Sequence, residues 1–151
     1  MSQRYLLDTN ICVFYLKGEF GIRERIQSVG LTNCFLSEIT IAELLFGVAN
    51  SAPSWQTKQR LDVAALRKSF AEQVFSIGPA LETFAEVKTH LRRLGRIVDS
   101  FDLLIGSTAL AYDLTLVTRN TRHFADMPGI RLADWIEPEE SENSRAAMAA
   151  R

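Results

Sequence analysis

The sequence of 151 residues contains only two cysteines, and both lie among apolar neighbours. Small secreted domains that depend on disulfides carry many more, so we expect no disulfide framework and a reducing, cytoplasmic compartment. No stretch approaches the roughly 20 apolar residues of a membrane-spanning helix, which predicts a protein without membrane contact. The first acid comes before any long apolar run, so no secretory signal is expected.

Net charge is also small, because 17 Lys and Arg residues face 18 Asp and Glu residues. This balance excludes a strongly basic protein that coats a polyanion. The stretch 137–151 holds four of the acids and two of the arginines, so 15 basic residues face 14 acids in the rest. We expect residues 1–136 to form one domain and residues 137–151 to form a polar, disordered tail.

Histidine is equally scarce. His90 and His123 have the spacing neither of a zinc site nor of a general-base pair, so surface or packing roles are expected for both.

The sequence shows no internal repeat and no interdomain linker. Trp55 and three other large aromatic residues are predicted to lie in the core or an interface; the others are Phe70, Phe84 and Trp135.

Short β-type runs alternate with longer helical patterns along the chain. Strands are predicted at residues 4–7, 34–37, 73–77, 115–118 and 130–132. Helices are predicted over residues 11–16, from 41, from 53, over 81–91 and over 103–111. This alternation predicts an α/β fold, a three-layer sandwich with a central, mostly parallel twisted sheet.

Acids stand where such a sheet forms its sites, beyond the carboxyl ends of the strands. Asp8 directly follows the first predicted strand. Thr40 is predicted to cap the next helix, which places Glu43 in its first turn. Asp102 is predicted in the first turn of a later helix, with Asp99 three positions earlier on the same face.

Two interpretations of these acids are open. Acids in a first helical turn are commonly caps, each stabilising a helix by about 0.3–1 kcal/mol. Capping does not explain three acids gathered at one end of one sheet, where they repel each other. Oxygen ligands favour Mg²⁺ or Mn²⁺, and such ions serve phosphodiester hydrolysis.

Four segments carry more specific patterns, namely Leu6-Leu7-Asp8-Thr9-Asn10, residues 40–47 (TIAELLFG), residues 102–109 (DLLIGSTA), and residues 116–124 followed by 128–135. In this order and at these spacings they resemble the motifs of PIN-domain nucleases, especially the VapC-type toxins of toxin–antitoxin pairs. The resemblance covers residues 5–135 and implies a PIN-like fold.

By this resemblance, Asp8, Glu43 and Asp102 match the catalytic acids that bind one or two Mg²⁺ or Mn²⁺ ions. A fourth family position, often acidic, falls on Asn120, which offers an oxygen but no charge. Asp99 lies just outside the matched position, so it is either an auxiliary ligand or, in the favoured interpretation, only a helix cap.

Polar neighbours of these acids have two interpretations each. Thr9 and Thr118 either bond to the acids and to the water molecules around the metal, or are β-branched residues that simply end strands. Arg119 and Arg122 either bind RNA phosphates or are solvated loop charges. A further basic cluster is placed at a helix end, where the macrodipole alone favours cations; it comprises Lys88, Arg92, Arg93 and Arg96.

The resemblance implies a metal-dependent endoribonuclease, the toxin of a VapBC-type pair. It further implies a structured RNA substrate such as tRNA or rRNA, a homodimer, and a VapB-type antitoxin that inserts a segment near the acidic pocket. The alternative is a noncatalytic PIN-like RNA-binding or scaffold module whose acids serve structure. A receiver-type domain ranks lower, because it needs a lysine after a late strand, where Arg119 and Asn120 stand.

Overall fold

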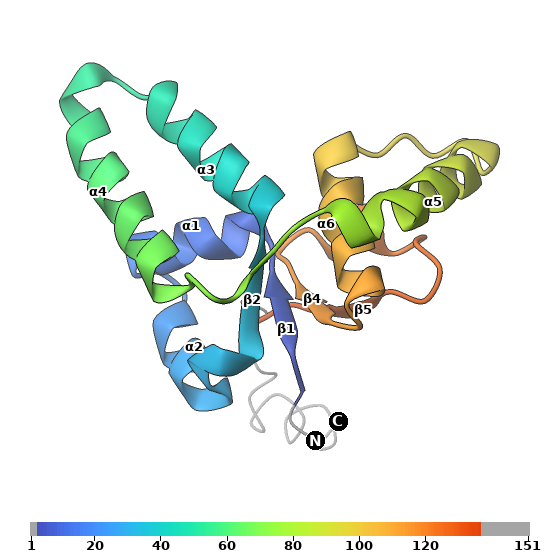
Figure 1. Cartoon of the computed structure of the whole chain (residues 1–151), viewed down its shortest axis with the longest axis horizontal. Helices are drawn as coiled ribbons and strands as arrows, with labels where there is room; N and C mark the ends of the chain where they lie inside the picture. Colours follow the sequence, from blue (N-terminus) through green and yellow to red (C-terminus); the bar gives the residue numbers. More distant parts are fainter. Residues whose placement is uncertain (1–2, 137–151) are drawn as a thin grey trace, which may run out of the picture.

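A computed structural model describes residues 3–136, which contain a five-stranded sheet covered by helices (Figure 1). The sheet order is β3-β2-β1-β4-β5, and every neighbouring pair is parallel. The strands are β1 (Tyr5–Leu7), β2 (Cys34–Ser37), β3 (Val74–Phe75), β4 (Thr115–Val117) and β5 (Arg131–Ala133). The predicted α/β fold is therefore confirmed. The predicted tail, residues 137–151, lies outside the described residues.

Helices cover both faces of this sheet. Leu6 and Leu7 point to opposite faces because side chains alternate along a strand, and they enter two separate cores. One core packs against α1 (Thr9–Lys17), α2 (Ile22–Val29), α3 (Glu38–Ala49) and α4 (Pro53–Ser69). The other packs against α5 (Leu81–Arg93), α6 (Ser100–Ala111) and α7 (Thr121–Phe124).

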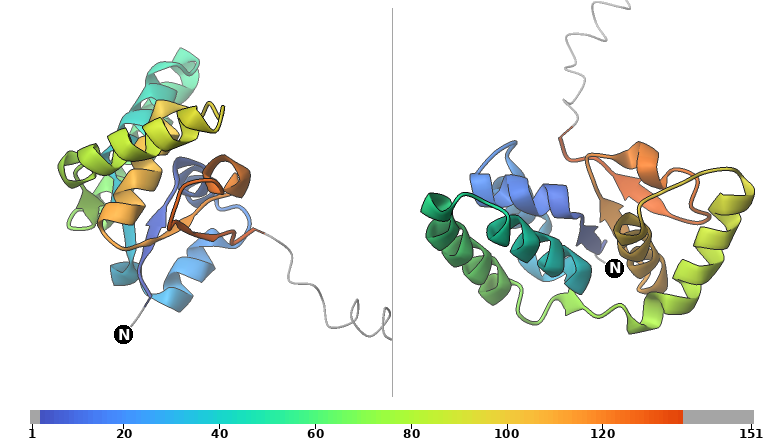
Figure 2. Two further views of the ribbon diagram at one scale, coloured as in Figure 1. Left: turned by 90° about the vertical axis from the view of Figure 1, so that its right-hand side faces the viewer. Right: turned by 90° about the horizontal axis from the view of Figure 1, so that it is seen from above.

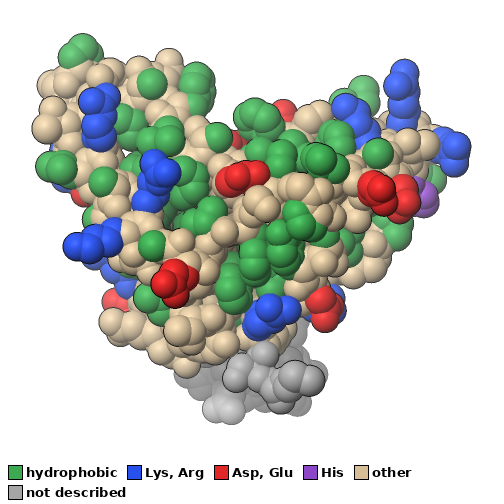
Figure 3. Space-filling view, in the orientation of Figure 1, with side chains coloured by type: hydrophobic (Ala, Val, Ile, Leu, Met, Phe, Trp, Pro, Cys, Tyr) green, Lys and Arg blue, Asp and Glu red, His purple; other side chains and the backbone are tan. Residues whose placement is uncertain are grey.

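The helices build two arms that rise from the sheet. Figures 1 and 2 show α3 and α4 side by side in one arm and α5 with α6 in the other. The space-filling view shows a notch between these arms (Figure 3). Strand β1 is central, and the chain crosses over in opposite directions to reach its neighbours β2 and β4. Such a reversal opens a crevice at the carboxyl ends of the strands, which is where sites form in open α/β sheets.

The predicted start of α3 is wrong by about one turn. Helix α3 begins at Glu38, and the hydroxyl of Ser37 accepts a hydrogen bond from the backbone N–H of Ile39 at 3.1 Å. Thr40 is therefore not a cap but a buried residue inside the helix, and Glu43 lies in the second turn rather than the first. Ser37 ends the paired part of β2, so its hydroxyl is the first cap that the chain offers.

Two short helices were not predicted. Helix α2 buries only Ile22 and Ile26, and it lies between Gly21 and Gly30, which both have positive φ. Ile22, Ile26 and Val29 recur at helical spacing and pack against the same core, so a signal for this short helix was present in the sequence. Helix α7 is a single turn of four residues. Strand β3 is shorter than the predicted 73–77, and β5 begins one residue later than predicted.

Both cysteines are buried as free thiols, as their apolar surroundings predict. Burial raises the pKa of the Cys34 thiol to about 12 and also raises that of Cys12, so both stay protonated and unreactive at neutral pH. Among residues 3–136, none of the helices combines the length and the hydropathy that crossing a membrane requires.

One glycine allows the close packing that holds α6 beside the segment after α7. A Cβ atom added at Gly106 would lie 2.7 Å from both the Sδ and the Cε atoms of Met127. Contacts this short do not occur between such atoms, so a larger residue at this position would require the buried end of the Met127 side chain to move. The consequence for the site is that α7 is held against the helix that carries Asp102.

Candidate functional site

Asp8 lies at the carboxyl end of the central strand and caps α1. Its Oδ1 accepts the backbone N–H of Thr9 at 2.8 Å, and its Oδ2 accepts the hydroxyl of Thr118 at 2.8 Å. Only 4% of Asp8 is exposed, and this burial raises the pKa of its carboxyl. The two hydrogen bonds oppose that rise, so the carboxylate is fixed in orientation but costly to keep charged.

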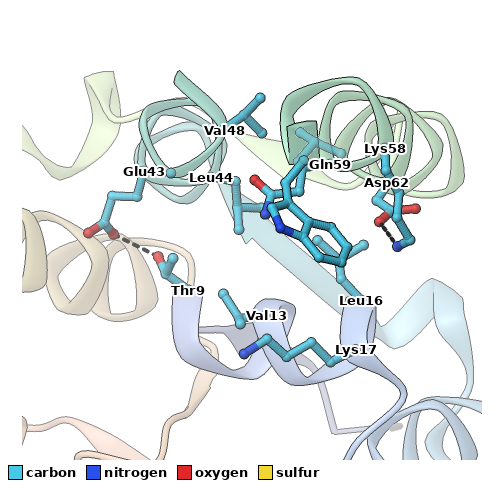
Figure 4. A pocket seen from close by; sticks show the side chains of 13 residues that line it. Thr9, Val13, Leu16, Lys17, Glu43, Leu44, Val48, Lys58, Gln59 and Asp62 are labelled. Carbon is cyan, nitrogen blue, oxygen red and sulfur yellow. Dashed lines mark hydrogen bonds and ion pairs between the residues drawn. The ribbon is translucent and has the colours of Figure 1, made fainter. Parts of the chain in front are cut away.

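Glu43 extends from α3 toward α1. The hydroxyl of Thr9 donates to Oε1 of Glu43 at 2.6 Å and lies 3.1 Å from the hydroxyl of Thr40 (Figure 4). Burial raises the pKa of the Glu43 carboxyl, and the negative charges of Asp8 and Asp99 raise it further. Thr9 therefore contacts Asp8 through its backbone and Glu43 through its side chain.

Asp99 and Asp102 lie at the N-terminus of α6. Asp99 is the helix cap, and its Oδ1 accepts the backbone N–H groups of Phe101 at 2.9 Å and Asp102 at 3.4 Å. Asp102 lies in the first turn, as predicted. Burial raises the pKa of the Asp102 carboxyl, and the charges of Asp99 and Glu43 add to that effect.

The four carboxyl groups therefore share one electrostatic environment. Asp8 is affected by Asp102, Glu43 by Asp8 and Asp99, and Asp102 by Asp99 and Glu43. Within residues 3–136, however, no three His, Cys, Asp or Glu side chains lie close enough to form a preformed metal site. The arrangement is thus an open set of repelling carboxylates, which we name the acidic centre. Its oxygen donors fit a hard divalent cation, which would relieve the repulsion.

His123 is the site residue that sequence reasoning missed. Its Nδ1 lies 3.3 Å from Oδ2 of Asp102, and this contact lowers the pKa of the Asp102 carboxyl against the effect of burial. The ring is more than half exposed, which agrees with the surface or packing role expected from the sequence. The contact with an acid of the site was not expected. No sequence signal pointed to it, because α7 was not predicted.

The residues after β4 lie at the same edge of the sheet. The backbone N–H of Asn120 donates to the Thr118 hydroxyl at 3.0 Å, and its side chain is exposed. Arg119 is partly committed elsewhere, because its guanidinium lies 3.5 Å from a carboxylate oxygen of Asp134. Arg122 is exposed on α7 beside His123, and no carboxylate of residues 3–136 pairs with it. Arg122 is therefore the better placed of the two to contact an anion.

A largely apolar groove of about 400 Å³ runs between α1, α3 and α4. Glu43 lies at one end of it, and the ion pair of Lys58 with Asp62, at 2.8 Å, lies at the other (Figure 4). Trp55 lines the groove and is 59% exposed, so it is not a core residue. The apolar lining also includes Val13, Leu16, Leu44, Val48 and Val63. The acidic centre thus adjoins an open apolar surface.

The fold and the site together define an α/β protein with an acidic centre at the carboxyl edge of a parallel sheet. The chain belongs to the PIN domain family, whose model matches residues 5–130. The resemblance that the four motifs indicated is therefore confirmed.

Relatives match over nearly their whole length. The chain is 34% identical over 133 residues to Ribonuclease VapC2 of Rickettsia felis, covering 87% of this chain and 97% of the relative. It is 32% identical over 137 residues to the tRNA(fMet)-specific endonuclease VapC of Shigella flexneri, covering 87% and 98%. The structure of VapBC2 from Rickettsia felis bound to a promoter DNA fragment matches with a TM-score of 0.80 and 28% identity, covering 88% and 99%. DNA-bound VapBC from Salmonella typhimurium matches with a TM-score of 0.78 and 30% identity, covering 88% and 98%.

Proposed function

We propose that the chain is an endoribonuclease dependent on Mg²⁺ or Mn²⁺, and the toxin of a VapBC-type toxin–antitoxin pair. The observation that carries this proposal is the gathering of Asp8, Glu43 and Asp102 at the carboxyl edge of a PIN-family sheet, where burial and neighbouring acids raise the pKa of each carboxyl. The names of the VapC relatives support the nuclease activity and the choice of RNA.

Asp8, Glu43 and Asp102 would hold one or two ions, with Asp99 and Asn120 as auxiliary oxygen donors. When bound, the ion neutralises charge on the scissile phosphate and activates the attacking water. The chain itself orients the ligands, because Thr118 and Thr9 each donate a hydroxyl hydrogen bond to one acid, at 2.8 and 2.6 Å. The Nδ1 atom of His123, 3.3 Å from Oδ2 of Asp102, helps to orient that carboxyl group.

RNA binding is assigned to the basic residues beside the acidic centre. Arg122 suits a phosphate contact because its guanidinium has no carboxylate partner among residues 3–136. Arg119 contributes after leaving its contact with Asp134, which is long at 3.5 Å. We propose a structured RNA substrate such as tRNA or rRNA, and a homodimer as the working assembly.

The partner proposed for the groove is a VapB-type antitoxin. An apolar helix or strand of such a partner fits the lining of Val13, Leu16 and Trp55, and the groove leads directly to Glu43. A cationic side chain at the end of that segment would then compete with the metal for the carboxylates. Solved neighbours with this fold are VapBC complexes, which supports a partner of this kind.

A larger side chain in the groove should lower the affinity for the partner without preventing the chain from folding. A Cβ atom at Gly47 meets no other atom within 4 Å, and Gly47 lies inside α3 at the groove wall. Gly47→Ala is expected to stabilise the chain by about 0.5–1 kcal/mol, because glycine is unfavourable inside a helix. Gly47→Leu is expected to fold equally well. Its side chain would occupy the part of the groove that the partner fills, so the affinity for the copurifying partner should fall at least about tenfold. Thermal melting and titration of the partner measure the two effects; equal partner affinity for both variants would contradict the assignment of the groove.

The function itself is tested by sequencing cellular RNA ends after brief expression of the wild-type chain. The control is Asp102→Asn, which removes one charge from the acidic centre. New RNA ends that appear only with the wild type are expected. RNA binding without cleavage, in the presence of Mg²⁺ or Mn²⁺, would instead support a noncatalytic PIN-like RNA-binding module.

A further inference from the structure

Helix α5 carries basic side chains that no carboxylate neutralises. Lys88, Arg92 and Arg93 have no ion-pair partner among residues 3–136, whereas Arg96, just beyond the helix, lies 2.9 Å from Asp126. Figure 3 shows Lys and Arg side chains gathered over the far end of the α5 arm. These cations are therefore available to an anionic ligand.

Lys88 brings this charge to the edge of the acidic centre. Its Nζ lies 3.3 Å from the hydroxyl of Ser100 and 5.5 Å from the centre of the Phe84 ring. Ser100 is the first residue of α6, between the cap Asp99 and the site residue Asp102. Arg92 follows Lys88 by four positions and so shares its face of α5. Together the two residues form a basic row that leads away from the acidic centre.

Stabilisation of the helix end does not account for this row. Three carbonyl groups of the last turn of α5, those of His90, Leu91 and Arg92, already accept backbone N–H groups of residues 94–96. No side-chain hydrogen bond from Arg92 to those carbonyls is found among residues 3–136. Lys88 lies before the last turn, and the macrodipole acts mainly within that turn.

We propose that Lys88 and Arg92 bind phosphates of the RNA strand on one side of the cleaved bond, so that the bound strand continues along α5. This inference rests on the proposed function and extends it by naming a second contact region on the RNA. The acidic centre repels a polyanion until cations fill it, so cationic side chains on an adjoining helix offset that repulsion. Arg122 lies on α7, which packs against α6 as α5 does, so two helices that contact α6 each offer the strand a basic side chain.

Arg93 provides a matched control. It has the same charge and lies in the same last turn as Arg92, but it points to a different face, a shallow surface depression lined by Ala85, Glu86 and Thr89. All three basic residues are exposed, so their alanine variants should fold normally, which melting curves check.

The experiment measures RNA affinity in an Asp8→Asn background at several salt concentrations. Lys88→Ala and Arg92→Ala are each expected to weaken binding about two- to fivefold and to reduce the slope of log K against log [salt] by about 0.7. Lys88→Arg should restore affinity, and Arg93→Ala should leave both quantities near the starting values. Equal losses of RNA affinity for Arg93→Ala and Arg92→Ala would indicate only diffuse electrostatic attraction and would overturn the proposal. Unchanged RNA affinity in either Lys88→Ala or Arg92→Ala would also overturn it.

A cleavage assay with two lengths of RNA separates this inference from the proposed function. With Asp8 restored, Lys88→Ala with Arg92→Ala should raise KM for a long RNA but leave KM unchanged for an oligonucleotide too short to reach α5. If the wild-type chain cleaves neither RNA with Mg²⁺ or Mn²⁺, the proposed function has failed. If it cleaves both and the double variant behaves like the wild type, only the assignment of α5 has failed.

Discussion

Replacing Asp8 with asparagine should abolish RNA cleavage by the purified chain while leaving it folded. The amide oxygen can still accept the Thr9 N–H, so the cap of α1 is kept, but the charge at the end of the central strand is lost. A charge that binds a catalytic cation lowers the barrier by several kcal/mol, so we expect its loss to reduce the rate at least about 100-fold. The measurement is the initial rate on a labelled RNA, with partner-free protein.

The matched control for Asp8→Asn is Asp113→Asn. Asp113 is an exposed carboxylate at the other end of α6, paired with Arg131 at 2.8 Å, and its backbone has a φ of 55°, which asparagine tolerates. Its variant should cleave RNA at the wild-type rate. Full activity of Asp8→Asn would remove Asp8 from the catalytic centre, whereas loss of activity in both variants would point to contamination or general misfolding.

Mg²⁺ or Mn²⁺ should raise the melting temperature of the wild-type chain. At 100 times its dissociation constant, a ligand of the folded state stabilises by about 2.7 kcal/mol, which corresponds to about 5–10 °C for a chain of this size. Asp8→Asn combined with Asp102→Asn should show little of this gain, because two of the three proposed charged ligands are gone. The readout is a thermal shift with and without the ion, and removal of the ion by EDTA should also stop cleavage.

The gain from the ion should grow as pH rises. Burial raises the pKa values of Asp8, Glu43 and Asp102 in the folded state above the ordinary 3.8 of Asp and 4.5 of Glu. The folded chain then holds more protons than the unfolded chain, so in EDTA its stability should fall as pH rises through the raised pKa values. The ion replaces those protons, so with Mg²⁺ or Mn²⁺ present the stability should no longer fall as pH rises. An identical pH dependence with and without Mg²⁺ or Mn²⁺ would show that no cation binds the acidic centre.

The sheet and the main acidic positions were predictable because they depend on local signals. A β-branched run such as Thr115–Val117 and an acid directly after a strand, such as Asp8, are visible within a few residues. The start of α3 was not predictable in this way, because Ser37 and Thr40 are both good caps. The choice depends on where β2 stops pairing with β3, which is a contact between distant segments.

Contacts across the fold account for the rest of what was missed. His123 and Asp102 are 21 residues apart and meet only because α7 packs beside α6. Arg119 was expected either to bind RNA phosphates or to be a solvated loop charge, and its contact with Asp134 depends on the chain returning after β5. The groove depends on three helices, so Val13 and Trp55 carried no sequence signal that they line one surface.

The position of β1 at the centre of the sheet has a consequence during protein synthesis. The hydrogen bond between Thr118 and Asp8 joins residues 110 positions apart, and β1 gains its neighbour β4 only when residues 115–117 are available. A nascent chain that ends before β4 therefore lacks both the strand that fixes Asp8 and the helix that carries His123. The centre is completed only when nearly the whole domain has left the ribosome, whereas α1, α3 and α4, the helices that line the groove, are synthesised first.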